Sequence, residues 1–147
     1  MGLTAILSVT NAEQASTFYA NAFGAQEIAR IPAPDNLRFL HVRMEVFGTK
    51  FVFMDEFPEL AGNDSNFKAP ESLRGTSVTL HLQVTDAMQV WAQAIEAGAK
   101  IVIPLEKQFW GELYGRLKDP FGHEWTIAQM IDYLADDEVA KAAINTL

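Results

Sequence analysis

The chain of 147 residues carries the same order of landmarks twice. Each half opens with a β-favouring run that leads to a helix-capping side chain, Asn11 in the first half and Asp86 in the second. Each predicted helix then stops at a Gly-Ala pair, and Gly98-Ala99 follows Gly24-Ala25 by 74 positions. A repeat of half the chain length predicts two copies of one supersecondary unit that pack against each other.

Both halves read as a strand, a helix and three further strands. Each predicted helix has an apolar face at i, i+3, i+4 and i+7, made of Ala15, Phe18, Tyr19 and Ala22 in one, and Ala87, Val90 or Trp91, Ala94 and Ile95 in the other. The predicted strands are 3–9, 27–31, 37–46 and 50–54, then 76–84, 100–103, 112–118 and 123–129. One such unit leaves a sheet face uncovered, so two must share a core. We therefore predict an α+β domain over residues 1–131, with βαβββ modules at about 1–57 and 76–131, a connector over 58–75 and a helical tail over 132–147.

The most distinctive motif is Asp119-Pro120-Phe121-Gly122-His123-Glu124-Trp125. Proline presets φ at the second position of a type I turn, the aspartate side chain accepts a backbone N–H, and glycine tolerates the exit conformation. The motif therefore predicts a hairpin that joins strands 112–118 and 123–129, held in part by hydrogen bonds of His123.

This hairpin resembles a known one. Together with Phe109-Trp110-Gly111-Glu112-Leu113-Tyr114-Gly115, it is similar to the last hairpin of the vicinal-oxygen-chelate superfamily, and to its PhnB-like branch in particular. That superfamily holds glyoxalase I, bleomycin- and fosfomycin-resistance proteins and extradiol dioxygenases. The resemblance implies two modules that form a half-open barrel of mixed β-sheet with flanking helices around a small-molecule cavity. It also implies a homodimer, in which half-barrels of two chains meet near that cavity.

The resemblance also bears on metal binding. Relatives that use a metal place His, Gln or Glu on the first, fourth, fifth and eighth strands. Alignment with them puts the first-strand position at Thr4, the fifth-strand position at Thr79 or, after a two-residue slip, at His81, and the eighth-strand position at Thr126. Because threonine is a poor ligand for transition metals, we expect no tightly bound metal and no other cofactor. A divalent metal held by His81 with Glu45 or Glu112 is the alternative.

His81 is the first catalytic candidate. Thr79, His81 and Gln83 alternate with apolar residues, so strand parity places them on the face opposite the core. The functional interpretation is a proton acceptor or ligand in the cavity, and the structural one is a hydrogen-bonded histidine.

Glu112 is the second candidate, and it shares its parity with Trp110 and Tyr114 at the mouth of the last hairpin. The two aromatic rings are suited to stack on a ligand while Glu112 accepts a proton or hydrogen bond, although large rings also serve packing. Relatives often have arginine where this chain has Leu113, so a cationic group for anionic substrates is missing there.

Composition excludes other classes of function. A net charge of −8 without a Lys/Arg stripe argues against nucleic acid as a partner. The sequence has no phosphate-cradling glycine loop, nucleophile elbow or paired-histidine zinc spacing. It also has no cysteine, no apolar run of the ~20 residues that a membrane span needs, and no signal peptide, which favours the cytoplasm.

The sequence therefore predicts a small-molecule-binding protein like those of the glyoxalase and bleomycin-resistance group. Its catalytic candidates are His81 and Glu112, and its ligand-binding candidates are Thr4, Thr79, Trp110, Tyr114 and Thr126. The alternatives are a metal-dependent lyase, isomerase or dioxygenase of the same superfamily, and an interaction module whose cavity is filled by side chains.

Overall fold

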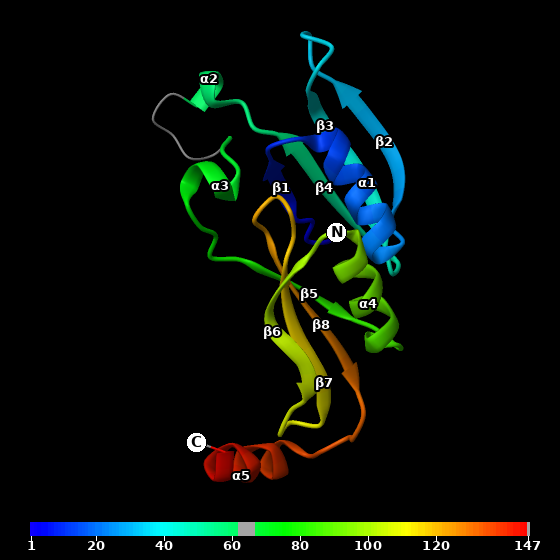
Figure 1. Ribbon diagram of the computed structural model, residues 1–147, viewed down its shortest axis with the longest axis vertical. Coiled ribbons are helices and arrows are strands. Elements are labelled where there is room, and N and C mark those ends of the chain that lie inside the picture. The colour runs from blue at the N-terminus through cyan, green and yellow to red at the C-terminus, as the bar shows by residue number, and fades with distance from the viewer. Residues whose placement is uncertain (62–66, 147) are drawn as a thin grey trace.

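The computed structural model describes residues 1–61 and 67–146 and contains two four-stranded sheets (Figure 1). The first sheet has the order β1-β4-β3-β2 and the second the order β5-β8-β7-β6. The strands of the first sheet are β1 (Ile6–Val9), β2 (Gln26–Pro32), β3 (Phe39–Val46) and β4 (Thr49–Asp55). Those of the second are β5 (Thr79–Gln83), β6 (Lys100–Lys107), β7 (Glu112–Lys118) and β8 (Glu124–Met130). Helix α1 (Ala12–Phe23) belongs to the first module and α4 (Ala87–Ala97) to the second.

The two sheets have the same topology. In each, the first strand runs parallel to the last one, β1 beside β4 and β5 beside β8, and the remaining neighbours are antiparallel. Neither sheet closes into a barrel, so β1 and β5 are edge strands. The predicted fold class, α+β with two βαβββ modules and half-open mixed sheets, is confirmed.

Both helices begin and end as the sequence predicts. The Asn11 side chain accepts the Gln14 N–H at 3.0 Å, and the Asp86 side chain accepts the Gln89 N–H at 3.1 Å. At the other ends, Gly24 and Gly98 adopt positive φ angles of 69° and 119°. The cap residues that the sequence predicts therefore mark the helix boundaries.

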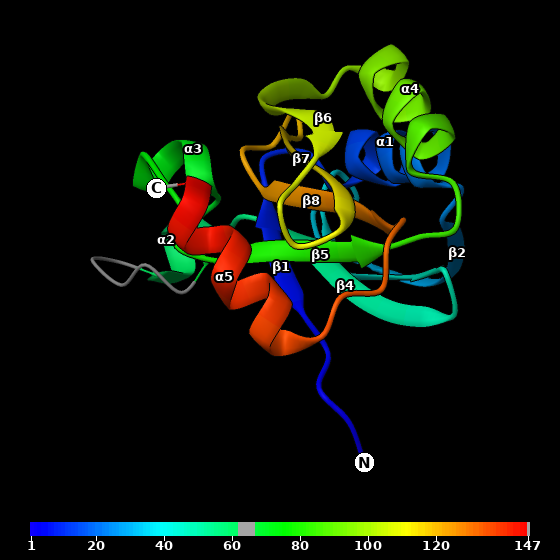
Figure 2. The same ribbon diagram turned by 90° about the horizontal axis from the view of Figure 1, so that it is seen from below.

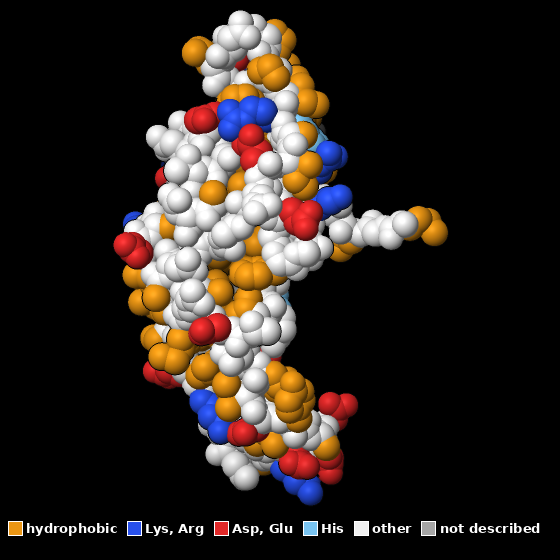
Figure 3. Space-filling model, turned by 90° about the vertical axis from the view of Figure 1, so that its right-hand side faces the viewer, with side chains coloured by type: hydrophobic (Ala, Val, Ile, Leu, Met, Phe, Trp, Pro, Cys, Tyr) orange, Lys and Arg blue, Asp and Glu red, His pale blue; other side chains and the backbone are white. Residues whose placement is uncertain are grey.

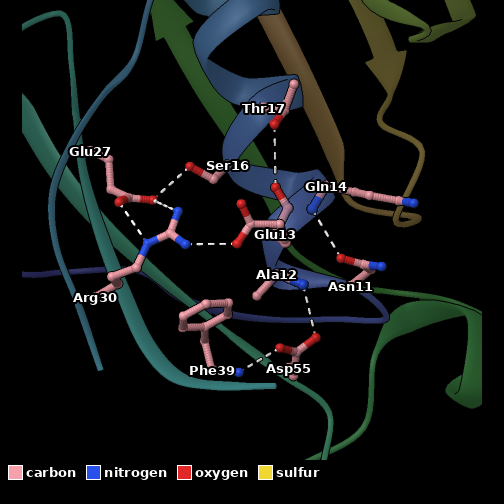
Figure 4. A network of polar contacts seen from close by, with 10 residues as sticks. All are labelled: Asn11, Ala12, Glu13, Gln14, Ser16, Thr17, Glu27, Arg30, Phe39 and Asp55. Carbon is pink, nitrogen blue, oxygen red and sulfur yellow. Dashed lines mark hydrogen bonds and ion pairs between the residues drawn. The ribbon is translucent and has the colours of Figure 1, made fainter. Parts of the chain in front are cut away.

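A second anchor holds each helix start to the end of the neighbouring strand. The buried Asp55 carboxylate of β4 accepts the Ala12 N–H at 2.8 Å and the Phe39 N–H at 2.7 Å (Figure 4). In the second module the Gln129 amide oxygen of β8 accepts the Ala87 N–H at 3.0 Å. The two modules thus use the same device with different acceptors.

Arg30 ties α1 to β2 on the same side of the first module. Its guanidinium bonds Glu27 on its own strand and Glu13 on the helix (Figure 4). The hydrogen bonds from Arg30 lower the pKa of Glu27. The pair is partly exposed, so it orients the helix more than it stabilises the fold.

The core lies between the modules, where α1 packs beside α4 (Figures 1 and 2). Tyr19 of α1 is fully buried in it and contacts the rings of Phe53 on β4 and Trp125 on β8, with centroids 5.4 and 5.5 Å away. Aromatic side chains from both modules therefore form one shared core.

Several elements differ from the sequence expectation at their ends. β1 begins at Ile6 and β5 at Thr79, each three residues later than predicted. The connector contains two short helices, α2 (Pro58–Ala61) and α3 (Pro70–Leu73), and α5 (Asp136–Thr146) follows the second sheet. The proposed division into a domain ending at residue 131 and a tail stays a prediction.

The molecule is long and curved, and its first residues extend away from the body (Figures 2 and 3). Large apolar side chains are exposed along it, among them Leu3, Ile6, Ile28, Ile31, Ile101 and Val102. Within the described residues, no helix has the length and apolar character needed to cross a membrane.

Candidate functional site

The predicted site residues of the second module lie on the sheet face that points away from α4. A Cβ on Gly115 would lie 2.5 Å from the Trp91 ring, which shows that this side of β7 faces the helix. Strand alternation therefore puts Glu112, Tyr114 and Arg116 on the opposite, helix-free face. The pairing of β5 with β8 places His81 beside Thr126 and Gln83 beside Ala128.

Five side chains on this face form a continuous hydrogen-bonded chain. His81 Nδ1 lies 2.7 Å from Thr126 Oγ1, and its Nε2 lies 3.0 Å from Gln83 Oε1. The Gln83 amide donates to Glu112 Oε2 at 2.7 Å, and the Trp110 indole donates to Glu112 Oε1 at 2.9 Å. We call these residues, Thr126, His81, Gln83, Glu112 and Trp110, the polar chain.

The proton positions in the polar chain follow from its two ends. The Glu112 carboxylate only accepts, so the Gln83 NH2 points to it and the Gln83 carbonyl accepts the His81 Nε2–H. The lone pair of neutral His81 is then at Nδ1, where the Thr126 hydroxyl donates to it.

A cavity of about 400 Å³ adjoins this chain along the free edge of β5. It is mostly apolar, and its polar groups include His81, Gln83 and Lys50. Residues 80–83 of β5 line it together with residues of the β3–β4 hairpin of the first module. An apolar hollow of this size with a few polar groups is typical of small-molecule sites.

Arg116 is a further charged group of the same face. Its register partner is Thr126, and its NH1 donates to Glu124 Oε2 at 3.2 Å. The Arg116 Nε–H is buried and has no hydrogen-bond partner among the described residues. Leu113 packs against the core on the other face of the strand, so Arg116 does not replace a cationic group at position 113.

The model of the glyoxalase/bleomycin resistance protein/dioxygenase superfamily matches residues 3–127. The chain belongs to this superfamily. An uncharacterized protein of Mycobacterium bovis is 40% identical over 136 residues, which are 92% of this chain and 88% of that protein. An uncharacterized protein of Arabidopsis thaliana is 31% identical over 129 residues, 84% of this chain and 74% of its own length.

Solved structures of the superfamily share the fold. The X-ray structure of an Arabidopsis thaliana gene product has a TM-score of 0.66 at 30% identity and covers 87% of this chain and 98% of its own. A PhnB protein of Bacillus cereus, described as a putative 3-demethylubiquinone-9 3-methyltransferase, gives 0.65 at 17% identity over 88% and 99%. The fosfomycin resistance protein FosX of Listeria monocytogenes gives 0.65 at 15% identity over 94% and 97%.

A metal-dependent member of the superfamily needs free ligating side chains at its site. The nitrogen and oxygen donors of His81 and Glu112 do not fit a transition metal here. Both ring nitrogens of His81 and both oxygens of Glu112 already have partners within the polar chain. Within residues 1–61 and 67–146, no group of three or more His, Cys, Asp or Glu side chains is arranged to hold a metal ion. The metal status of this superfamily member nonetheless stays a prediction.

The structure brings most of the predicted site residues together. Thr126, His81, Glu112 and Trp110 belong to the polar chain, and the Tyr114 ring packs edge-on against Trp110 at 5.3 Å. Thr79 lies on the same face, beside Glu124. Thr4 is exposed, precedes β1 and takes part in none of the hydrogen bonds of the polar chain, although its neighbours Leu3 and Ala5 line the 400 Å³ cavity.

Two residues of the site were given no role from sequence. Gln83 connects His81 to Glu112, and Arg116 supplies the guanidinium of this face. The signal for both was strand parity, because Gln83 alternates with His81, and Arg116 with Glu112 and Tyr114.

A larger cavity, of about 590 Å³, lies between β1, β5 and α3. Its histidine, His123, donates from Nε2 to the Ser8 carbonyl at 2.8 Å and so fastens the last hairpin to β1. We take the cavity at His81 as the candidate site because the polar chain adjoins it.

Proposed function

We propose that this chain binds a small molecule in the cavity at the β5 edge, with His81 and Gln83 at its polar end and without a tightly held metal. The observation that carries the proposal is the polar chain, which leads from this cavity to Glu112 and Trp110. Binding through the His81 imidazole would replace one of the two hydrogen bonds that its ring nitrogens make in the polar chain. The protein is in that case either a sequestering or a catalytic member of the superfamily.

Occupancy of the cavity is tested with anilinonaphthalene sulfonate, a dye that fluoresces in apolar surroundings. We expect saturable binding of one dye per chain. His81→Trp should block it by filling the polar end, and since His81 is exposed, the fold should survive. His41→Trp on β3 of the other sheet is the matched control and should bind as the unaltered chain does. Equal binding by all three proteins would contradict the proposal.

The role of the polar chain is tested with His81→Ala, Gln83→Ala and Glu112→Gln. Each substitution should leave the melting temperature nearly unchanged. Each should weaken the binding of the dye, or of a metabolite found by thermal-shift screening, by about 1–3 kcal/mol. If His81→Ala unfolds the protein, His81 is a structural histidine and the site assignment is wrong.

Metal content separates this proposal from a metal-dependent lyase, isomerase or dioxygenase. Elemental analysis of the purified protein should find no stoichiometric Zn, Ni, Mn or Fe. If the unaltered protein holds one equivalent of one of these metals and His81→Ala has lost it, the result would favour the metal-dependent enzyme.

We also propose that the chain forms a homodimer. Support comes from the open edges of β1 and β5 and from exposed apolar residues such as Ile6, Ile28 and Ile101. Sedimentation at micromolar concentration should show a dimer, and a monomer alone would refute it. The cytoplasmic location stays a prediction from the sequence.

A further inference from the structure

A cavity of about 360 Å³ lies apart from the His81 site and shares no lining residue with it. Its walls come from three separate segments of the chain: α3 with the two residues after it, the start of β6, and the end of β7 with the turn of residues 119–122. The turn that defines the most distinctive sequence motif thus forms part of a hollow to which the proposed function assigns no role.

Three cationic side chains, Arg74, Lys100 and Lys118, line this cavity. None of them forms an ion pair with any residue that the structure describes. Lys100 and Lys118 lie directly opposite each other on β6 and β7, an arrangement that is destabilising for like charges. Such a concentration of positive charge stands out in a chain with a net charge of −8.

Two of the three nearby carboxylates are hydrogen-bonded to other groups and form no ion pair with these cations. Asp119 is buried and its two oxygens already accept four hydrogen bonds, from Tyr19, Trp125 and the N–H groups of Phe121 and His123. Glu124, which is opposite Lys118 on β8, accepts a hydrogen bond from Arg116. Glu71 is the remaining carboxylate at the cavity.

The walls are held in place by close backbone packing. A Cβ on Gly122 would lie 2.9 Å from Pro70 Cβ, so the turn lies directly against α3. Arg74 is kept in a left-handed conformation, φ 61°, at the end of α3, where its N–H bonds the Glu71 carbonyl and the Gly75 N–H bonds the Pro70 carbonyl. The position of the Arg74 backbone relative to the turn is therefore defined by the fold.

We propose that this cavity binds a small molecule through a phosphate-type oxyanion with two or more negative charges, held by Arg74, Lys100 and Lys118. A guanidinium matches two oxygens of such a group, and the two ammonium groups supply point charges around it. The cavity is larger than one phosphate and within the size range of ligand sites, so it has room for the organic part of a phosphate ester. The site is independent of the proposed function at His81.

The test is calorimetric titration of the full chain with pyrophosphate at low ionic strength. We expect one site per chain and a loss of affinity of about tenfold or more in Lys100→Gln and in Lys118→Gln. Lys141→Gln on α5 removes the same charge elsewhere and should change the affinity by less than about twofold. Glu71→Gln removes the opposing carboxylate and should tighten binding, which a purely structural role of Glu71 would not produce.

Three results would overturn the proposal: no saturable binding by the unaltered chain, an equal loss in Lys141→Gln, or a loss in His81→Trp but not in the lysine variants. The last would place the anion in the β5-edge cavity. Thermal melting of each variant separates lost binding from lost folding, and the two lysine variants serve as independent checks on each other.

Discussion

Tyr19 on α1 donates its phenolic hydrogen to the carboxylate of Asp119, 100 positions further along the chain, at 2.6 Å. Asp119 also accepts the Trp125 indole N–H and two backbone N–H groups of its own turn. The aspartate that opens the hairpin motif therefore shapes the turn and fixes the second module to the helix of the first. Its role is structural.

Replacing the phenol should destabilise the protein without disturbing its shape. Tyr19→Phe keeps the ring but removes one buried donor to Asp119, so the free energy of unfolding should fall by about 1–3 kcal/mol. Urea unfolding measures the change. Tyr133→Phe, at an exposed tyrosine, is the control and should have almost no effect. Equal stability of the two variants would show that the bond contributes nothing.

The same hydroxyl should make stability depend on alkaline pH. Burial, and then the adjacent charge of Asp119, raise the pKa of Tyr19 well above its usual value. The contribution is complete below pH ~10, where the unfolded chain also keeps this proton. Above that pH the unfolded chain releases the proton and the folded one retains it, so stability falls as pH rises. Unfolding curves between pH 8 and 11 should therefore show a smaller alkaline decline in Tyr19→Phe than in the unaltered chain.

The two helix anchors should differ in strength. The two oxygens of the buried Asp55 carboxylate accept the N–H groups of Ala12 and Phe39. Asp55→Asn keeps one of these acceptors and replaces the other with an NH2 group, which cannot accept and would face a backbone N–H. We expect a loss of about 1.5–3 kcal/mol, the range for hydrogen bonds to a charged group. Gln129→Ala removes one neutral bond to Ala87 and should cost about 1 kcal/mol. A larger loss in Gln129→Ala, measured by chemical unfolding, would contradict this order.

A side chain at position 115 should not fit unless the Trp91 ring moves. A Cβ there would lie 2.5 Å from the indole and 2.9 Å from the Leu105 backbone. Gly115→Ala should therefore destabilise the protein by about 1–3 kcal/mol through overpacking. If Trp91 is first replaced by leucine, adding Gly115→Ala should cost less stability than it does in the unaltered chain. If the thermal melts show that the effects of the two substitutions simply add, the clash is excluded.

Much of the fold follows from local sequence. Asn11, Asp86, Gly24 and Gly98 determine where the helices start and stop, because their effects act within one turn of the chain. The repeated order of these landmarks predicts two modules with one topology. The Asp119–Gly122 turn is local in the same way, and its hydrogen bonds to Phe121 and His123 are those that the sequence predicts.

Strand ends and the exact site residues were harder to predict. Thr4 falls outside β1 because pairing with β4 begins only at Ile6, and no residue pattern marks that point. The ligand-binding role of Thr4 stays a prediction.

The sequence by itself determined which face of each strand a side chain occupies, since alternation along a strand is a property of the backbone. It thereby placed His81, Glu112 and Tyr114 on one face. Only the tertiary structure decided which of them meet, because that depends on register between strands distant in sequence. Gln83 reaches Glu112, 29 positions away, across the small side chain of Ala128, its register partner on the intervening strand β8. The registers of β5 and β7 against β8 thus turn separate polar residues into one hydrogen-bonded chain.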